Sequence, residues 1–270
     1  MTEIRDLEQL QENQKQLEQS IENFTTPFAF GIGLATKSAN GNILDVYYPA
    51  PQLGSDPYTC ALAANAVNWK GKTGSYELEE KHMRDIQGIL ESAEKNIGYS
   101  EESTQIIQPL LDAALNTDSP NGERIVVVCF ISDSTDDPVD AVDAYLRLHL
   151  LSTRLVKPHG IDLTGIFGLL TNCVWTNLGP FEVEGFNVIR AQMQAEGTEI
   201  LVHGLDKFPR MTDYVIPAGV RIADANRVRL GAHLSDGTTV MHEGFCNFNA
   251  GTLGASMIEG RISAGVVVGD

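Results

Sequence analysis

The last 57 residues, from Tyr214 to Asp270, carry an apolar residue at every sixth position. An α-helix repeats about every 3.6 residues and a strand every two, so neither has this period. The pattern predicts a left-handed parallel β-helix, in which each hexad is one flat face of a triangular coil and its first residue fills the interior. The apolar positions are Ile216, Ile222, Val228, Leu234, Val240 and Cys246, and most are followed four places later by a small residue (Asn226, Ala232, Thr238, Gly244).

The six-residue phase breaks after Cys246. Ile262 and Val268 restart it, displaced by four positions. The segment between them, residues 247–254, is expected to be a loop that leaves the coil at a corner. Loops on rigid scaffolds often carry function, so we expect the functional residues in this region.

The upstream pattern predicts an α/β domain. A helix over 5–22 places Leu7, Leu10, Leu17 and Ile21 on one side, and it could pack on the domain or against a partner subunit. We divide the chain into an N-terminal helix extension (1–25), an α/β N-terminal domain (26–205) and the left-handed β-helix domain (206–270). The other predicted elements are a hairpin (28–34 and 43–48) turning at Asn40-Gly41, helices over 80–93 and 103–116, a buried strand over 125–131, a helix from an Asp137 N-cap to about Val156, and short strands at 174–176 and 200–202.

Composition places the chain among ordinary globular proteins, with 43% apolar and 20% charged residues. No apolar run of about 18 residues and no signal peptide is present, and the four cysteines are widely spaced, so we expect a cytoplasmic protein with buried free thiols. A net charge of −17, nearly all from residues 1–200, argues against nucleic acid as a partner, and a membrane partner is not expected either. The arginines of the hexad region would suit small anionic substrates, although a solvated surface also explains them.

Three motifs fail on spacing. Gly71-Lys72-Thr73 resembles the end of a phosphate loop, but Ala66 stands where that loop needs glycine. Gly31-Ile32-Gly33 lacks the third glycine of a dinucleotide site. The aspartates at 133, 136 and 137 fit no calcium loop and are expected to cap a helix.

The remaining candidates lie in or beside the hexads. Glu259 and Arg261 alternate along a strand, so both can point to the same face, although such a pair can also be a surface ion pair. The others are Arg227, Arg229, His242, Glu243, Asn247 and Asn249.

The hexad region contains several distinctive motifs. They are DKFPRMTDYV at 206–215, VRIAD at 220–224, VRLGAH at 228–233, TTVMHEGF at 238–245, NFNAGT at 247–252 and IEGRISAGV at 258–266, with AYLRLHLLS, KPHG, VWTN and GIGLAT upstream. These motifs closely resemble those of tetrahydrodipicolinate N-succinyltransferases, in the longer-chain branch of actinobacteria and pseudomonads. The resemblance is most specific over 206–270 and also covers 28–48 and 140–205, whereas it is weak over 50–135 and the helix at 5–22 looks like an addition.

The resemblance implies transfer of a succinyl group from succinyl-CoA to the amine of L-2-amino-6-oxopimelate, in diaminopimelate and lysine biosynthesis. It also implies a homotrimer with active sites between neighbouring β-helices. Glu259 matches the family's catalytic glutamate and Arg261 a succinyl-CoA contact. Glu243 matches a magnesium ligand, but the second metal position is Asn226, and a neutral amide is a poorer ligand for Mg²⁺ than a carboxylate. Magnesium, if bound, would then be structural.

Acyl transfer from a thioester leaves two roles open for Glu259, as a nucleophile that forms an anhydride or as a base that deprotonates the incoming ammonium. His242 and His233 are reserve candidates for the base. Arg229 and Arg261 could bind substrate carboxylates bidentately, and Asn247 and Asn249 complete the expected substrate and CoA site.

Family chains continue well past the position of Asp270, so the resemblance predicts a truncated coil that is weakly active or inactive alone. Two other functions stay open. One is acyl transfer with another donor, such as acetyl-CoA, or another amine, and the other is a non-enzymatic trimerisation module.

Overall fold

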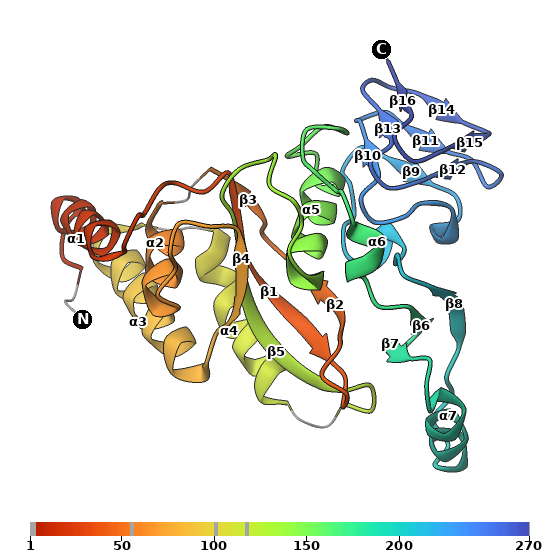
Figure 1. Ribbon diagram of the computed structural model, residues 1–270, viewed down its shortest axis with the longest axis horizontal. Coiled ribbons are helices and arrows are strands. Elements are labelled where there is room, and N and C mark those ends of the chain that lie inside the picture. Colours follow the sequence, from red (N-terminus) through yellow and green to blue (C-terminus); the bar gives the residue numbers. More distant parts are fainter. Residues whose placement is uncertain (1–3, 55–56, 100–101, 117–118, 270) are drawn as a thin grey trace. The chain divides into compact units, whose positions relative to one another are not determined.

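The computed structural model describes residues 4–54, 57–99, 102–116 and 119–269 (Figure 1). The chain forms two compact units, each built from segments separated in the sequence. The first contains Met1–Ala35, Tyr48–Asp118 and Arg124–Asp136, and the second contains Thr36–Tyr47, Ser119–Glu123 and Asp137–Asp270. The domain boundaries that we drew after residues 25 and 205 stay predictions.

A five-stranded sheet has the strand order β2-β1-β5-β4, with β3 antiparallel to β1. The predicted hairpin is confirmed, because Gly41 turns the chain with a φ of 86° and its N–H donates to the Ser38 carbonyl at 2.9 Å. The predicted buried strand is also confirmed as β5. The bounds are β1 Ala29–Lys37, β2 Ile43–Tyr47, β3 Gln52–Leu53, β4 Gly74–Glu77 and β5 Glu123–Ile131.

Four helices pack in the first unit: α1 (Leu7–Ser20), α2 (Pro57–Ala66), α3 (Glu80–Ile97) and α4 (Glu102–Leu115). They cover alternate side chains of the sheet, including Phe30, Ile32 and Phe130, and Trp69 stacks on Phe130 at 4.7 Å. The helices predicted over 5–22, 80–93 and 103–116 are confirmed, whereas α2 was not predicted. Helix α1 packs on α2, in agreement with one of the two options for its apolar side.

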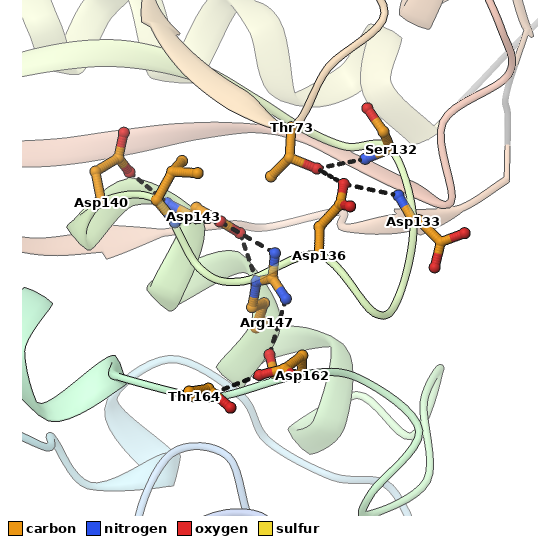
Figure 2. Close-up of polar contacts among 10 residues, drawn as sticks. Thr73, Ser132, Asp133, Asp136, Asp140, Asp143, Arg147, Asp162 and Thr164 are labelled. Carbon is orange, nitrogen blue, oxygen red and sulfur yellow. Dashed lines mark hydrogen bonds and ion pairs between the residues drawn. The ribbon is translucent and has the colours of Figure 1, made fainter.

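The turn at Gly71-Lys72-Thr73 is held by side chains of its own unit (Figure 2). Thr73 Oγ1 donates to the Asp136 carboxylate and accepts from the Ser132 N–H at 2.8 Å. The Asp133 carboxylate accepts from the Thr135 N–H at 2.8 Å. These contacts give the turn a structural role.

Helix α5 (Ala141–Ser152) is the buried helix of the second unit. Its N-cap is Asp140, which accepts from the Asp143 N–H at 2.8 Å, so the predicted Asp137 cap is wrong. The helix also ends earlier than predicted, because Arg154 adopts a positive φ of 66°. Arg147 donates to the Asp143 carboxylate at 2.7 Å and to the Asp162 carbonyl at 2.8 Å, which compensates two charges with no exposed side-chain surface (Figure 2).

His149 lies on the same helix and is itself fully buried beside aromatic rings. Its Nδ1 donates to the Tyr145 carbonyl at 2.7 Å, and its ring faces Tyr47 and Tyr214 with centroids 6.4 and 5.7 Å away. Burial lowers the pKa of His149 to about 4, so the imidazole is neutral at pH 7.

A second, antiparallel sheet has the order β7-β6-β8, with β6 at Cys173–Thr176, β7 at Gly179–Glu182 and β8 at Val202–Asp206. The strand predicted at 174–176 is confirmed as β6. The strand predicted at 200–202 lies further along the chain, as β8. Two helices in this region, α6 (Ile166–Leu169) and α7 (Phe186–Ala195), were not predicted.

The C-terminal part is a coil of short parallel strands that visits three sheets in turn (Figure 1). Interior residues of successive turns stack on one another, so that Ile222 pairs with Val240 and Val240 with Ile258. Parallel sheets and six-residue strand spacing agree with the predicted repeat. The sheets are β9 (Arg221–Ile222), β11 (Thr239–Val240) and β14 (Met257–Ile258); β12 (Phe245–Cys246) and β15 (Arg261–Ile262); and β10 (His233–Leu234), β13 (Gly251–Thr252) and β16 (Val267–Val268).

The repeat does not break after Cys246, so the loop predicted over 247–254 is wrong. Thr252 continues the phase, pairs with Leu234 and is fully buried inside the coil. The apolar pattern missed it because its side chain is polar. Thr252 Oγ1 lies 2.7 Å from Thr238 Oγ1 and accepts from the Ser235 N–H at 3.1 Å, so its hydroxyl is satisfied inside the core.

Ile216 is a second correction, because it is 78% exposed instead of filling the interior. Met211, on the 3₁₀ turn Met211–Asp213, is fully buried in the core cluster of the coil. A residue before the first strand of the coil therefore takes the place expected for Ile216. All four cysteines are buried and free, as predicted.

None of the helices in the described ranges is long and apolar enough to cross a membrane.

Replacing Thr252 by valine should lower the free energy of unfolding by about 1–3 kcal/mol, because Thr238 and the Ser235 N–H lose a buried partner. Urea denaturation would measure the loss. Thr239→Val, at a half-buried position of the same coil, is the matched control. Equal stability of the T252V variant and the wild type would contradict this account of the interior.

The buried His149 should make stability depend on pH. In the unfolded chain its pKa is near 6.5 and in the folded chain about 4, so between these values only the unfolded state binds the proton. The free energy of unfolding should therefore fall by roughly 3 kcal/mol as the pH drops from 6.5 to 4. The difference between wild type and His149→Gln in denaturant titrations across this range isolates the effect, and parallel pH profiles would refute it.

Candidate active site

The predicted site residues concentrate at the corner where the chain passes from the sheet β9-β11-β14 to the sheet β12-β15. Two successive turns use four residues to round it, 223–226 and 241–244. The third turn uses only two, Glu259 and Gly260, before Arg261 pairs with Phe245. The displacement of the apolar repeat comes from this shortened corner and not from a loop after Cys246.

Glu259 lies at the shortened corner with an exposed side chain. The register of the coil places it directly after Ile258, in line with Met241 of the preceding turn. Within the described part of the chain, its carboxylate has neither a hydrogen bond nor an ion pair. The group is therefore accessible to a substrate.

Gly244 allows the shortened corner to sit on the turn before it. A Cβ at this position would lie 2.2 Å from the Ile258 carbonyl oxygen, which is main chain and cannot move aside alone. The Gly244 N–H donates to the Met241 carbonyl at 2.8 Å and closes the turn. A glycine at this corner thus allows the turn that contains Glu259 to pack closely on the turn before it.

A charged network surrounds the same corner. Glu243 lies 3.0 Å from His242 Nε2 and 3.8 Å from Arg227 Nη2. Asn226 directs its amide N–H to Asp224 Oδ1 at 3.0 Å. Glu243 and Asn226 therefore have partners within the chain, and the described residues contain no group of three or more His, Cys, Asp or Glu that could hold a metal. Magnesium therefore stays a prediction.

Arg229 is used internally. Its Nη2 donates to the Asp206 carboxylate and its Nη1 to Asn247 Oδ1 at 3.2 Å. The guanidinium carbon lies 5.4 Å from the ring centroid of Phe208 and 5.9 Å from that of Phe245. Asn247 Oδ1 also accepts from the Phe248 N–H at 2.9 Å, so both residues predicted to bind substrate have structural partners.

Asn249 lies at the next corner, away from the group around Glu259. It adopts a positive φ of 51°, and its Oδ1 accepts from the His159 N–H at 2.8 Å. His159 Nε2 in turn donates to the Gly265 carbonyl at 2.8 Å. Asn249 therefore attaches the segment after α5 to two turns of the coil.

The two reserve histidines differ in accessibility. His233 is buried, donates through Nδ1 to the Val156 carbonyl at 3.0 Å, and has its pKa lowered mainly by burial. His242 is 72% exposed beside Glu243. Burial also raises the pKa of Cys246 to about 12, so this thiol is not a nucleophile.

A cavity of about 170 Å³ adjoins the corner in the second unit. Arg229, Asn226 and Phe245 contribute to its wall, so it is continuous with residues already described. The other residues that line the cavity could not be predicted from the apolar repeat, because most of them precede the coil. Asp206 and Phe208 do belong to the stretch with the most specific resemblance. The other lining residues include Trp175, His203, Asp206, Phe208 and Arg210.

Comparison with known proteins gives a consistent result. The family model described as Tetrahydrodipicolinate N-succinyltransferase N-terminal matches residues 8–168, and the model described as Tetrahydrodipicolinate N-succinyltransferase middle matches residues 170–210. A protein of Salinispora tropica named 2,3,4,5-tetrahydropyridine-2,6-dicarboxylate N-succinyltransferase is 47% identical over 91% of this chain and 66% of its own length. A Vibrio cholerae protein of the same name is 46% identical over 90% of this chain and 66% of its own.

A crystal structure from Campylobacter jejuni, assigned as a 2,3,4,5-tetrahydropyridine-2-carboxylate N-succinyltransferase, superposes with a TM-score of 0.84. It is 28% identical and covers 100% of this chain and 71% of its own. The chain thus spans about 66% of the length of the curated relatives that it matches.

Gly244→Ala should lower the free energy of unfolding by about 1–3 kcal/mol, because the added methyl group collides with the Ile258 carbonyl. Gly260→Ala is the matched control, since a Cβ there meets no atom within 4 Å. Thermal denaturation of both variants would measure the difference. A G244A variant as stable as G260A would show that the corner is not tightly packed.

Proposed function

Because the chain belongs to the tetrahydrodipicolinate N-succinyltransferase family, we propose that it transfers a succinyl group from succinyl-CoA to the amine of L-2-amino-6-oxopimelate, in diaminopimelate and lysine biosynthesis. The observation that carries this proposal is the shortened corner, where a carboxylate without a partner among the described residues stands two residues from an arginine. The relatives from Salinispora tropica and Vibrio cholerae carry the name of this activity.

The reaction requires a free amine to attack the thioester carbonyl. A C–N bond forms, the C–S bond breaks, and the CoA thiolate takes up a proton. Glu259 is accessible for either of the two roles left open by its chemistry, removal of a proton from the incoming ammonium or attack on the thioester to give an anhydride. Arg261, also exposed, would bind the free carboxylate of the succinyl group.

The proposal includes a left-handed coil and a homotrimer. Parallel sheets visited in turn, with interior partners 18 residues apart in the first two turns, support the β-helix. Apolar side chains on the outside of the coil support association with further copies, because Met257 is 66% exposed and Val266 48%. Neighbouring coils would then complete the site around Glu259.

Glu259→Gln should lower kcat by about 100-fold or more, since both proposed roles need the carboxylate. Release of CoA from succinyl-CoA in the presence of the amine acceptor would measure this. Glu196→Gln, an exposed position on another part of the second unit, is the control and should keep wild-type kcat.

Hydroxylamine separates the two roles, because it traps an anhydride at Glu259 as a hydroxamate that mass spectrometry detects. A trapped adduct supports the nucleophile, and its absence during turnover supports the base. Wild-type kcat in the E259Q variant would overturn the assignment of Glu259.

A further inference from the structure

Phe245 lies between two guanidinium groups. It belongs to the middle turn of the coil, while Arg229 comes from the turn before and Arg261 from the turn after. The guanidinium carbon of each arginine is 5.9 Å from the ring centroid. An aromatic ring attracts a cation at this distance through the negative charge of its face.

The two arginines are in different states. Arg229 has its carboxylate partner in Asp206 and a second contact with Phe208. Arg261 is exposed and makes no ion pair with any residue in the described ranges. The ring thus contacts one arginine that is fixed by other partners and one that is exposed and makes no ion pair with the described residues.

Arg229 also lies next to a group of packed aromatic rings. Phe208 stacks on Phe248 at 4.4 Å with an interplanar angle of 10°, and Phe167 meets both rings edge-on. Arg229 is therefore anchored by a salt bridge and by buried rings. Contact with the fixed Arg229 restrains the Phe245 ring, because a rotation of the ring would break this contact.

An unrestrained arginine loses considerable side-chain entropy when it binds a carboxylate. A guanidinium that already lies on a ring has less freedom to lose, and its N–H donors in the plane stay available for a bidentate contact. Stacking on Phe245 would thus prepare Arg261 for an anion before the anion arrives.

We propose that Phe245 is a positioning residue that holds Arg261 for the free carboxylate of a dicarboxylic acyl group. This inference rests on the proposed function, since the acyl donor there is a succinyl ester. The ring then contributes to the preference for an acyl group with a terminal carboxylate, without touching the reacting atoms.

The test compares Phe245→Leu with Phe245→Tyr, which keeps the ring. The leucine variant should raise the KM for succinyl-CoA about two- to fivefold at unchanged kcat, and the tyrosine variant should behave as the wild type. The KM for acetyl-CoA, if that ester is used, should not change. Phe186→Leu, which removes a buried ring from a separate apolar cluster of the second unit, controls for a loss of stability and should leave KM unchanged.

In an Arg261→Gln background, Phe245→Leu should have no further effect on KM, because the ring acts through the arginine. An equal effect of F245L in both backgrounds, or no effect in either, would overturn the inference. So would a fall in kcat shared by F245L and F245Y, which indicates general disruption.

Calorimetric titration with free succinate separates this inference from the proposed function. Succinate binding that weakens two- to fivefold in F245L and is restored in F245Y supports the positioning role, even if the wild type transfers no succinyl group and the proposed function fails. Succinyl transfer with succinate affinity and KM both independent of Phe245 removes the inference and leaves the function standing. The inference is also overturned if the wild type binds no succinate and the F245L variant has the wild-type KM for succinyl-CoA.

Discussion

The parallel main-chain ladder between successive turns of the coil is the constraint on which the candidate site depends. Hydrogen bonds such as Met241 N–H to the Ile258 carbonyl, at 2.9 Å, fix which residue of one turn stands above which residue of the next. Interior side chains stack as a result, and so do the exterior ones. The ladder brings Phe245 against Arg261, and it places Glu259 in line with Met241. The chemistry of the corner thus follows from register, with little contribution from the loops that usually carry sites in other folds.

The sequence predicted those parts of the fold in which burial and polarity alternate clearly. The hexads from Ile222 to Cys246 were found because each interior residue is apolar, and Thr252 was missed because two hydroxyl groups satisfy each other inside the coil. Helix α2 was not predicted because it has no polar face. Residues from Tyr58 to Ala64 are all buried, so they show no amphipathic period. The Asp137 cap was mistaken because Asp140, three residues later, offers the same chemistry, and only the fold decides between them.

The candidate site was predictable in its residue types but not in their partners. Glu259, Arg261, Glu243 and Asn226 do gather at one corner, as alternation along a regular repeat would require. Arg229 was indistinguishable in sequence from a free anion-binding arginine, because its partner Asp206 lies 23 residues away in another sheet. Asn249 is similar, since its contact with His159 spans 90 residues. Long-range pairing of charged and amide groups leaves no periodic trace in the chain.

The shortened corner has a consequence for how such chains diverge. Two residues fewer at Glu259-Gly260 leave the pairing of Cys246 with Ile262 and of Thr252 with Val268 intact, so the corner absorbs a change in length that a strand could not. An alignment that insists on an unbroken six-residue spacing will misplace every position after Ile258 by two. Insertions and deletions at this corner can therefore reshape the pocket over evolutionary time while the scaffold beneath it is inherited unchanged.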